Sequence, residues 1–304
     1  MKKVLPIGIE SFDKLFDWDC YYVDKTLLIK ELIDRRCEVT LITRPRRFGK
    51  TLALSMLSRF FDITRDSREM FSNLDIMEHG DIVGKHMNKY PVIFLSLKDV
   101  VSPNHEGALE KMADVISALY REKSYLVDGE RAHPTDTLLH ERYSSLKATS
   151  GQLELSLLHL SRMLHSYHKK RVIVLLDEYD APIDNAEAKG FYGDMIEFMR
   201  GFMGSTLKSN DHLEFAVVTG VQRIAQEGLF SKLNNPKVYG ILNSKYSSQF
   251  GFTEEEVADM CKEYDAGNTM DEIRAFYDGY RFGDKDMYNP WSILNYLSSF
   301  RSVR

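Results

Sequence analysis

Residues 44–51 read Arg-Pro-Arg-Arg-Phe-Gly-Lys-Thr, and the final Gly-Lys-Thr is the usual end of a phosphate-binding loop. The full pattern is G-x-x-x-x-G-K-S/T, and Arg44 stands where its first glycine would be. Such a loop binds anions because backbone N–H groups point inward at the positive end of a helix. A basic surface turn that contains Gly-Lys-Thr by chance is the alternative. The stretch predicts a site for the phosphates of a nucleotide.

The residues of this loop have separate expected roles. Lys50 supplies a full positive charge to the phosphates, and the Thr51 hydroxyl is a ligand for magnesium. Arg46 and Arg47 either contact phosphates, act as fingers in a neighbouring subunit, or are exposed arginines beside a basic loop. The residues expected to bind the nucleotide are Arg46, Arg47, Phe48, Gly49, Lys50, Thr51 and Leu52.

A pair of carboxylates follows an aliphatic run later in the chain. Val172 to Leu176 lead directly into Asp177 and Glu178, which is the form of a buried parallel strand ending in a Walker B pair. Asp177 is expected to complete the Mg²⁺ shell with Thr51, and Glu178 to polarise the water that attacks the γ-phosphate. Alone, the pair would fit a solvated strand end equally well. Beside a Gly-Lys-Thr loop it predicts the acidic half of a nucleotide site.

Two further residues are candidates for sensing the γ-phosphate. Thr219 ends an apolar run that we expect to form the strand next to Asp177. Arg223 follows four residues later and is in reach of the γ-phosphate or of a partner's site, although a salt bridge on a loop explains it equally well. With Glu178 and Lys50, these residues complete the predicted catalytic set.

Strands and helices alternate around these motifs. Short apolar and β-branched runs predict strands at residues 39–43, 90–97, 172–176 and 213–220. Helical spacing of apolar residues predicts helices at 52–61 and 191–207. This order favours an α/β fold with a mainly parallel sheet covered by helices. The first, third and fourth strands then end at one edge of the sheet, where open α/β sheets bind ligands.

Residues 104–170 read as a mostly helical insertion. Their apolar spacing predicts two helices divided near Pro134. The polar stretch 124–150 is the expected flexible part, with His133 and His140 exposed.

The character of the chain changes at about residue 251. A capping-box pattern starts a helix at Thr253, and further helices are predicted near 269–278 and 290–299. We therefore expect residues 1–250 to form the sheet domain and residues 251–304 to form a small helical subdomain.

Two groups of aromatic residues flank the phosphate-binding motifs. Tyr21 and Tyr22 precede the first strand, where they would either form a wall against adenine or pack in the core. Core packing is also expected for the second group, Tyr277, Tyr280, Phe282, Tyr288 and Trp291.

The composition is that of an ordinary globular protein. The chain has 304 residues, of which 43% are hydrophobic and 28% charged, and its net charge of −5 argues against a generally basic surface for nucleic acid. Cys20, Cys37 and Cys261 lack the spacing of a disulfide framework or a zinc site. No segment approaches the roughly 20 apolar residues of a membrane span, and no signal peptide is recognisable. These features predict a cytoplasmic protein without membrane contact.

Several strings taken together resemble the predicted AAA-ATPase-like family of bacterial proteins. The resemblance runs from Leu5 to Leu297 and is specific only as a combination. The strings are YYVDKTLLIKEL (residues 21–32), TRPRRFGKTLALSML (43–57), PVIFLSLKD (91–99), LLDEYDAPI (175–183), TGVQRIAQEGLFSKLNN (219–235), FGFTEEEV (250–257), YDGYRFG (277–283) and YNPWSIL (288–294).

The resemblance implies a P-loop NTPase fold for residues 1–250, with ATP and Mg²⁺ as cofactors. The family's loop commonly reads RPRRFGKT, so Arg44 is a family trait. Members usually continue into a region that resembles a PD-(D/E)XK nuclease, and no residues for one follow Tyr296. We therefore expect residues 251–304 to be a truncated subdomain. A DNA or nuclease-module partner is implied by the resemblance alone.

The leading functional hypothesis is Mg²⁺-dependent ATP hydrolysis that drives a conformational change. The alternative is a nucleotide-binding switch or scaffold with little turnover, which presents a surface to protein or DNA. Only Glu178 favours hydrolysis over this alternative. The sequence leaves self-association open.

Overall fold

A five-stranded parallel sheet forms the centre of the protein. The computed structural model describes residues 2–128, 133–208, 210–222, 236–266, 270–277 and 279–301, and in it the strands lie in the order β2-β3-β4-β1-β5. Their bounds are β1 (Val39–Thr43), β2 (Val92–Ser96), β3 (Val172–Asp177), β4 (Leu213–Gly220) and β5 (Lys237–Tyr239). The predicted α/β fold with a mainly parallel sheet is confirmed. The short edge strand β5 was not predicted, because three residues carry too little apolar pattern.

Alternate side chains of each strand enter two separate cores. On β3, Val174 and Leu176 pack into the first core, whereas Ile173 and Leu175 pack into the second. A parallel strand that is covered on both faces has no polar side, so its sequence reads as a continuous apolar run. The same alternation decides which face receives each polar residue at the carboxyl end of a strand.

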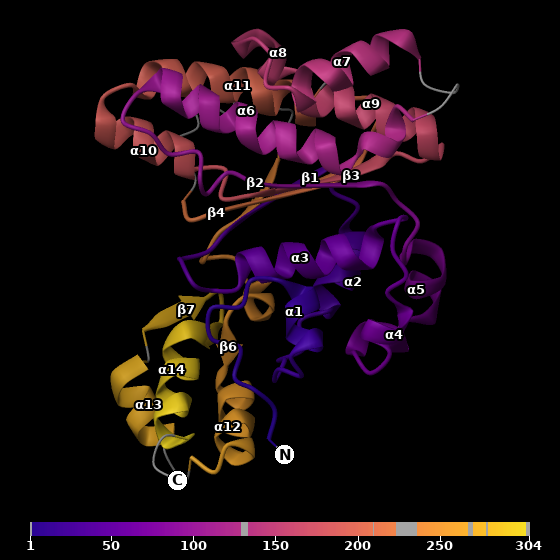
Figure 1. Cartoon of the computed structure of the whole chain (residues 1–304). Coiled ribbons are helices and arrows are strands. Elements are labelled where there is room, and N and C mark those ends of the chain that lie inside the picture. The colour runs from indigo at the N-terminus through magenta and orange to yellow at the C-terminus, as the bar shows by residue number, and fades with distance from the viewer. Residues whose placement is uncertain are drawn as a thin grey trace.

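One face of the sheet is covered by the helices of the insertion together with those that follow β3, as Figure 1 shows above the sheet. Their bounds are α6 (His105–Glu122), α7 (Pro134–Ser144), α8 (Ser150–Glu154), α9 (Ser156–His168), α10 (Ala181–Lys189) and α11 (Tyr192–Leu207), with a 3-10 turn, η2 (Ser124–Leu126).

The helix that starts at the Gly-Lys-Thr sequence lies on the opposite face, with the N-terminal helices around it (Figure 1). This layer comprises α1 (Phe12–Asp17), α2 (Leu27–Arg35), α3 (Lys50–Phe61), α4 (Arg68–Phe71), η1 (Asp75–Glu78) and α5 (Gly80–His86).

The insertion holds more helices than the two that the sequence predicts. The division at Pro134 is confirmed because α7 begins there, but α8 and α9 follow as separate helices. A capping box at Thr149 starts α8. His133 is exposed as predicted, whereas the prediction for His140 is wrong: it is buried, and its Nε2 lies 2.8 Å from the carbonyl oxygen of Tyr120. An acceptor inside the helical layer thus compensates the burial of the ring.

The C-terminal region combines the three predicted helices with a small sheet. Its elements are η3 (Ser247–Gln249), β6 (Phe252–Thr253), α12 (Glu254–Glu263), α13 (Met270–Tyr277), β7 (Tyr280–Phe282), β8 (Lys285–Tyr288) and α14 (Pro290–Arg301), and the strands are antiparallel in the order β6-β8-β7. The region is therefore not helical alone. It lies beside the loop end of α3 (Figure 1).

Candidate functional site

The loop at residues 44–49 turns sharply into α3. Arg47 and Gly49 have φ values of +68° and +79°, in the left-handed region, and α3 begins at Lys50. Glycine adopts this conformation without steric cost. Lys50 is buried at 4% exposure, and its Nζ donates to the carbonyl oxygens of Arg44 and Pro45 at 3.0 Å each. Burial lowers the pKa of Lys50, while the charges of Glu178 and Asp177 oppose that fall.

Asp177 accepts hydrogen bonds from two threonine hydroxyls. Thr51 Oγ1 donates to Oδ2 at 2.7 Å, and Thr219 Oγ1 donates to Oδ1 at 2.5 Å. The strand order explains this meeting, because β4 lies between β1 and β3. Side chains two residues apart on a strand lie on the same face of the sheet. Asp177 is therefore on the same face as Leu175, and Thr219 on the same face as Val217. Leu175 and Val217 both pack on the α3 side, so Asp177 and Thr219 lie on that side too. The predicted neighbourhood of Thr51, Asp177 and Thr219 is therefore present.

These oxygen atoms fit the preferences of magnesium. Mg²⁺ is usually held by one or two protein oxygens together with phosphate and water, and Thr51 and Asp177 offer a hydroxyl and a fully buried carboxylate at the start of α3. Within the described ranges, no group of three or more His, Cys, Asp or Glu side chains is arranged to hold a metal.

Glu178 faces the same cavity as the loop. Its backbone is left-handed, with φ +51°, and its side chain is half-buried beside Lys50 and Thr51. Burial raises the pKa of Glu178, the neighbouring Asp177 adds to the rise, and Lys50 opposes it.

Arg44 has a structural task that its place in the motif does not reveal. The side chain is 0% exposed, and Nη1 donates to the carbonyl oxygens of Thr43 and Tyr239 at 2.8 and 2.9 Å. Nη2 donates to the carbonyl of Tyr246 at 3.2 Å, and the guanidinium lies 4.9 Å from the ring centroid of Phe282. Burial lowers the pKa of Arg44 to about 10. The arginine thus joins the loop to β5, to the segment before η3 and to the small sheet.

The other predicted loop residues divide into exposed and buried ones. Arg46 and Arg47 are exposed, and the Arg47 guanidinium lies 4.1 Å from the ring centroid of Trp291. The ring of Phe48 is fully buried in a cluster with Phe282 and Met287. Phe48 therefore anchors the loop on the small sheet through its side chain, and it also borders the cavity.

A cavity of about 340 Å³ connects the loop with both ends of the chain. Its lining brings together the predicted loop residues 46–52, Glu178, an N-terminal group and a C-terminal group. The N-terminal group is Pro6, Gly8, Ile9, Glu10, Leu15, Tyr21, Tyr22, Val23 and Lys25; the C-terminal group is Gln249, Gly251, Phe252, Pro290, Trp291 and Leu294.

Three of the aromatic residues considered in the sequence, Tyr21, Tyr22 and Trp291, border this cavity. Tyr21 and Tyr22 border it and also pack on other rings, Tyr21 against Tyr264 and Tyr22 against Phe12. The prediction that Trp291 belongs to a core is wrong, because it is 42% exposed at the rim.

Core packing is confirmed for Phe282 and Tyr288 and is wrong for Tyr280, which is 41% exposed. The side chain of Tyr277 lies outside the described part of the structure, as does the whole of Arg223.

Sequence reasoning missed three residues near the site. Tyr179 and Asp180 hydrogen-bond the backbone just after β4, and the DEYD sequence offered the signal of a third acid in one motif. Lys25 contacts the C-terminal region: its Nζ donates to both Glu256 carboxylate oxygens at 2.5 and 2.7 Å. No spacing rule connects residues so far apart in sequence.

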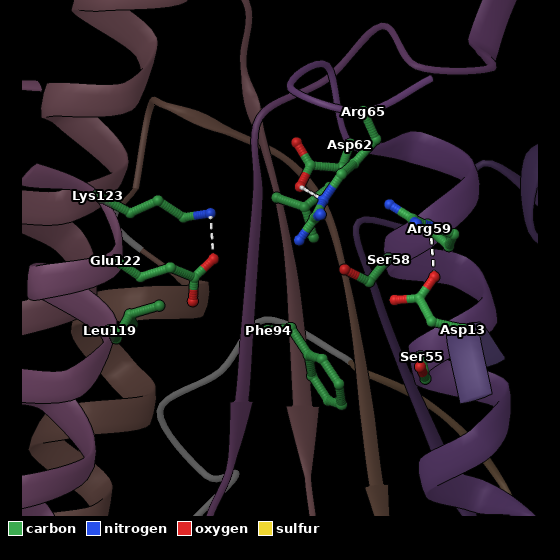
Figure 2. A pocket seen from close by; sticks show the side chains of 11 residues that line it. Asp13, Ser55, Ser58, Arg59, Asp62, Arg65, Phe94, Leu119, Glu122 and Lys123 are labelled. Atoms are coloured by element: carbon green, nitrogen blue, oxygen red, sulfur yellow. Dashed lines mark hydrogen bonds and ion pairs between the residues drawn. The ribbon is translucent and has the colours of Figure 1, made fainter. Parts of the chain in front are cut away.

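A second cavity, of about 210 Å³, lies at the open edge of the sheet beside β2. Figure 2 shows Glu122 and Lys123 on one side of it and the charged residues near the end of α3 on the other. Its charges occur in pairs, which are Arg59 with Asp13 at 2.6 Å, Lys123 with Glu122 at 3.0 Å and Arg65 with Asp62 at 3.9 Å. Because these charges balance, the cavity favours no ion of either sign.

No helix in the described part of the chain is both long and apolar enough to cross a membrane.

Comparison with known proteins agrees with the geometry. A family model described as a predicted AAA-ATPase matches residues 6–230. A protein described as uncharacterized in the vnfD 5′ region of Azotobacter chroococcum mcd 1 is 30% identical over 295 residues, which cover 96% of this chain and 51% of that protein. The chain thus spans about half the length of this curated relative. No solved structure matches this chain. Because the family model covers most of the chain, including the loop and both acidic residues, the chain belongs to the predicted AAA-ATPase-like family.

Proposed function

We propose that this chain binds ATP with Mg²⁺ and hydrolyses it. The observation that carries the proposal is the hydrogen-bonded set of Thr51, Asp177 and Thr219 beneath the loop that holds Lys50. It places a hydroxyl, a buried carboxylate and an ammonium at the N-terminus of one helix, where phosphate and a divalent cation are both favoured. Membership in the family supports nucleotide binding.

Each residue has a defined role in the proposed reaction. Lys50 and the loop N–H groups bind the β- and γ-phosphates, and Thr51 and Asp177 hold the magnesium ion. The ion supplies neutralisation of the phosphate charge. Glu178 accepts a proton from the attacking water, and Thr219 keeps the Asp177 carboxylate oriented. Positioning and charge neutralisation account for most of the catalysis of phosphoryl transfer.

We assign the apolar end of the cavity to the nucleoside. Tyr21 and Val23 come from the N-terminal segment, and Pro290 and Leu294 come from α14, so a base there would lie between two distant parts of the chain. Aromatic and aliphatic walls suit a planar base that loses water on binding. ATP is proposed because the sequence has no NKxD motif for reading guanine.

Coupling to a conformational change would run through the contacts that the C-terminal helices α12 and α14 make with the loop and with the N-terminal segment. Arg47 lies over Trp291 at the start of α14, and Lys25 pairs with Glu256 on α12. A triphosphate in the loop would compete with the Trp291 ring for the Arg47 guanidinium, because phosphate is the stronger partner for arginine.

The test is an ATP titration by calorimetry combined with a phosphate-release assay. Lys50→Ala should lower the ATP affinity at least tenfold. The substitution removes the positive charge at the start of α3 that is proposed to bind the phosphates. Glu178→Gln should retain affinity and lose turnover. Lys208→Ala, which changes an exposed lysine after α11, is the matched control.

Two outcomes would contradict the proposal in different ways. Unchanged ATP affinity in Lys50→Ala would refute the phosphate site. Tight Mg²⁺-ATP binding by the unmodified chain with no phosphate release would refute hydrolysis and favour a nucleotide-dependent switch.

A further inference from the structure

Tyr179 and Asp180 hold the chain where it leaves β4. The Tyr179 N–H donates to the carbonyl of Thr219 at 3.1 Å, and its hydroxyl donates to the carbonyl of Gln222 at 2.9 Å. The Asp180 carboxylate accepts the N–H groups of Val221 and Gln222 at 2.7 and 3.0 Å. Two adjacent side chains and one backbone group thus bind four backbone groups of the turn at residues 219–222.

We call Tyr179 and Asp180, with the backbone groups that they bind at residues 219–222, the clamp, and both side chains of the clamp are buried. Tyr179 is 0% and Asp180 2% exposed. A Cβ atom on Gly220 would lie 2.6 Å from the Tyr179 ring and 2.9 Å from Asp180 Oδ1, so only glycine allows the turn to approach this closely. A carboxylate that accepts two backbone N–H groups at such burial makes strong, directional hydrogen bonds.

Glu178 lies between this clamp and Asp177, and its backbone is unusual. In an extended strand the side chain after Asp177 would lie on the opposite face, with Leu176. Glu178 instead has φ +51° and borders the same cavity as Lys50. A left-handed conformation is sterically unfavourable for a residue other than glycine, so neighbouring anchors must maintain it. Those anchors are the two threonine bonds to Asp177 on one side and the clamp on the other.

We propose that Tyr179 and Asp180 are positioning residues that hold Glu178 in its left-handed conformation and so direct its carboxylate into the nucleotide cavity. Neither residue lines that cavity, so we expect neither to touch a nucleotide bound there. They act through the turn at residues 219–222, which is itself fixed to the sheet by β4. This inference rests on the proposed ATP hydrolysis, in which Glu178 accepts the proton.

The kinetic test compares Asp180→Asn and Tyr179→Phe with a neighbouring control. Both variants should retain ATP affinity within twofold and lose ten- to hundredfold in kcat, the range expected when a catalytic group moves by about 1 Å. Asp184→Asn is the control, because the Asp184 carboxylate accepts the side-chain amide of Gln222, at 2.9 Å, instead of its backbone, and the variant should leave kcat unchanged.

A double-mutant cycle separates positioning from general damage. If the clamp acts through Glu178, adding Asp180→Asn to Glu178→Gln should lower turnover no further, because the group it orients is already disabled. A further drop in the double variant would overturn the inference, as would unchanged kcat in Asp180→Asn. If the number of ATP molecules bound per chain falls in proportion to kcat, part of the protein has lost its fold, and the role of the two residues is purely structural.

Hydrogen–deuterium exchange tests the clamp without turnover. Asp180→Asn should accelerate amide exchange at residues 177–180 and 219–222, and Asp184→Asn should not. Unchanged exchange in both segments would overturn the clamp even if the chain hydrolyses ATP. If the unmodified chain binds ATP and releases no phosphate, the proposed hydrolysis fails, and the clamp is judged by exchange alone.

Discussion

Replacing Arg44 by glycine would restore the usual phosphate-loop pattern, and we expect it to destabilise the protein. The usual argument for glycine is conformational freedom, but Arg44 is absent from the described residues with positive φ. Its side chain instead binds three carbonyl oxygens at 2.8, 2.9 and 3.2 Å in a fully buried site. The substitution therefore removes contacts without relieving backbone strain.

The expected magnitude follows from opposing contributions. Burial lowers the pKa of Arg44 from its ordinary value to about 10, which corresponds to about 3 kcal/mol against the charged form, and the substitution would relieve this cost. Three hydrogen bonds from a charged donor contribute roughly 1.5–3 kcal/mol each, and the ring contacts add about 1 kcal/mol. Glycine adds roughly 0.5–1 kcal/mol of backbone entropy. The balance is a destabilisation of roughly 3–8 kcal/mol, which is a large part of the roughly 5–15 kcal/mol typical of a folded protein.

Urea unfolding followed by far-UV circular dichroism measures this difference. The urea concentration at the midpoint of unfolding should fall. The dependence of the unfolding free energy on urea concentration should change little, since the surface exposed on unfolding is almost the same. Arg46→Gly is the matched control in the same loop, because that side chain is exposed, and we expect a change below about 1 kcal/mol. An Arg44→Gly variant as stable as the parent, with ATP affinity retained, would refute the reasoning.

Four further outcomes follow from the contacts. Thr219→Val removes the hydroxyl bonded to Asp177 and should lower turnover about tenfold with ATP affinity retained, as measured by phosphate release and calorimetry. The raised pKa of Glu178 means that its active, deprotonated form is lost as pH falls, and at a higher pH than for an ordinary glutamate; a pH–rate profile should show this acid limb. Gly220→Ala should destabilise by about 1–3 kcal/mol in urea unfolding because of the 2.6 Å approach to a ring, whereas Gly204→Ala, with open space inside α11, should stabilise by roughly 0.5–1 kcal/mol. Lys25→Met should lower stability by roughly 1–3 kcal/mol, because its partner carboxylate on α12 loses a partly buried ion pair.

Four results would contradict these expectations. Thr219→Val with normal turnover would exclude an orienting role for the hydroxyl. A flat pH–rate profile would exclude Glu178 as the proton acceptor. Equal effects of alanine at Gly220 and Gly204 would mean that the end of β4 is loosely packed. For Lys25→Met, unchanged stability would show that the ion pair does not join the N-terminal segment to α12.

The main strands and the loop that leads into α3 could be predicted because their signals are local. An apolar run such as Val172 to Leu176 indicates a strand covered on both faces, and Gly49-Lys50 at a helix start indicates an anion site. The insertion was harder to predict, since its separate helices depend on caps such as that of Thr149, which interrupt one continuous apolar spacing.

The site could be predicted in its parts and not in its connections. Thr219 follows the Asp177 strand by some forty residues, and only the order of the strands brings its hydroxyl to that carboxylate. Arg47 and Trp291 lie near opposite ends of the chain, so no pattern linked them. A DNA or nuclease-module partner remains a prediction from the family resemblance, and self-association remains open.

The sequence by itself determined which groups are available at the carboxyl edge of the sheet: a lysine at a helix start, a threonine, and two adjacent acids. Their types and spacing follow from local rules of strand alternation and helix initiation. Tertiary structure alone decided what Arg44 and Glu178 do. Arg44 became a buried link to β5 and the small sheet because distant carbonyl oxygens surround it. Glu178 faces the cavity because residues after β4 hold its neighbours, and such long-range hydrogen bonds leave no periodic trace in sequence.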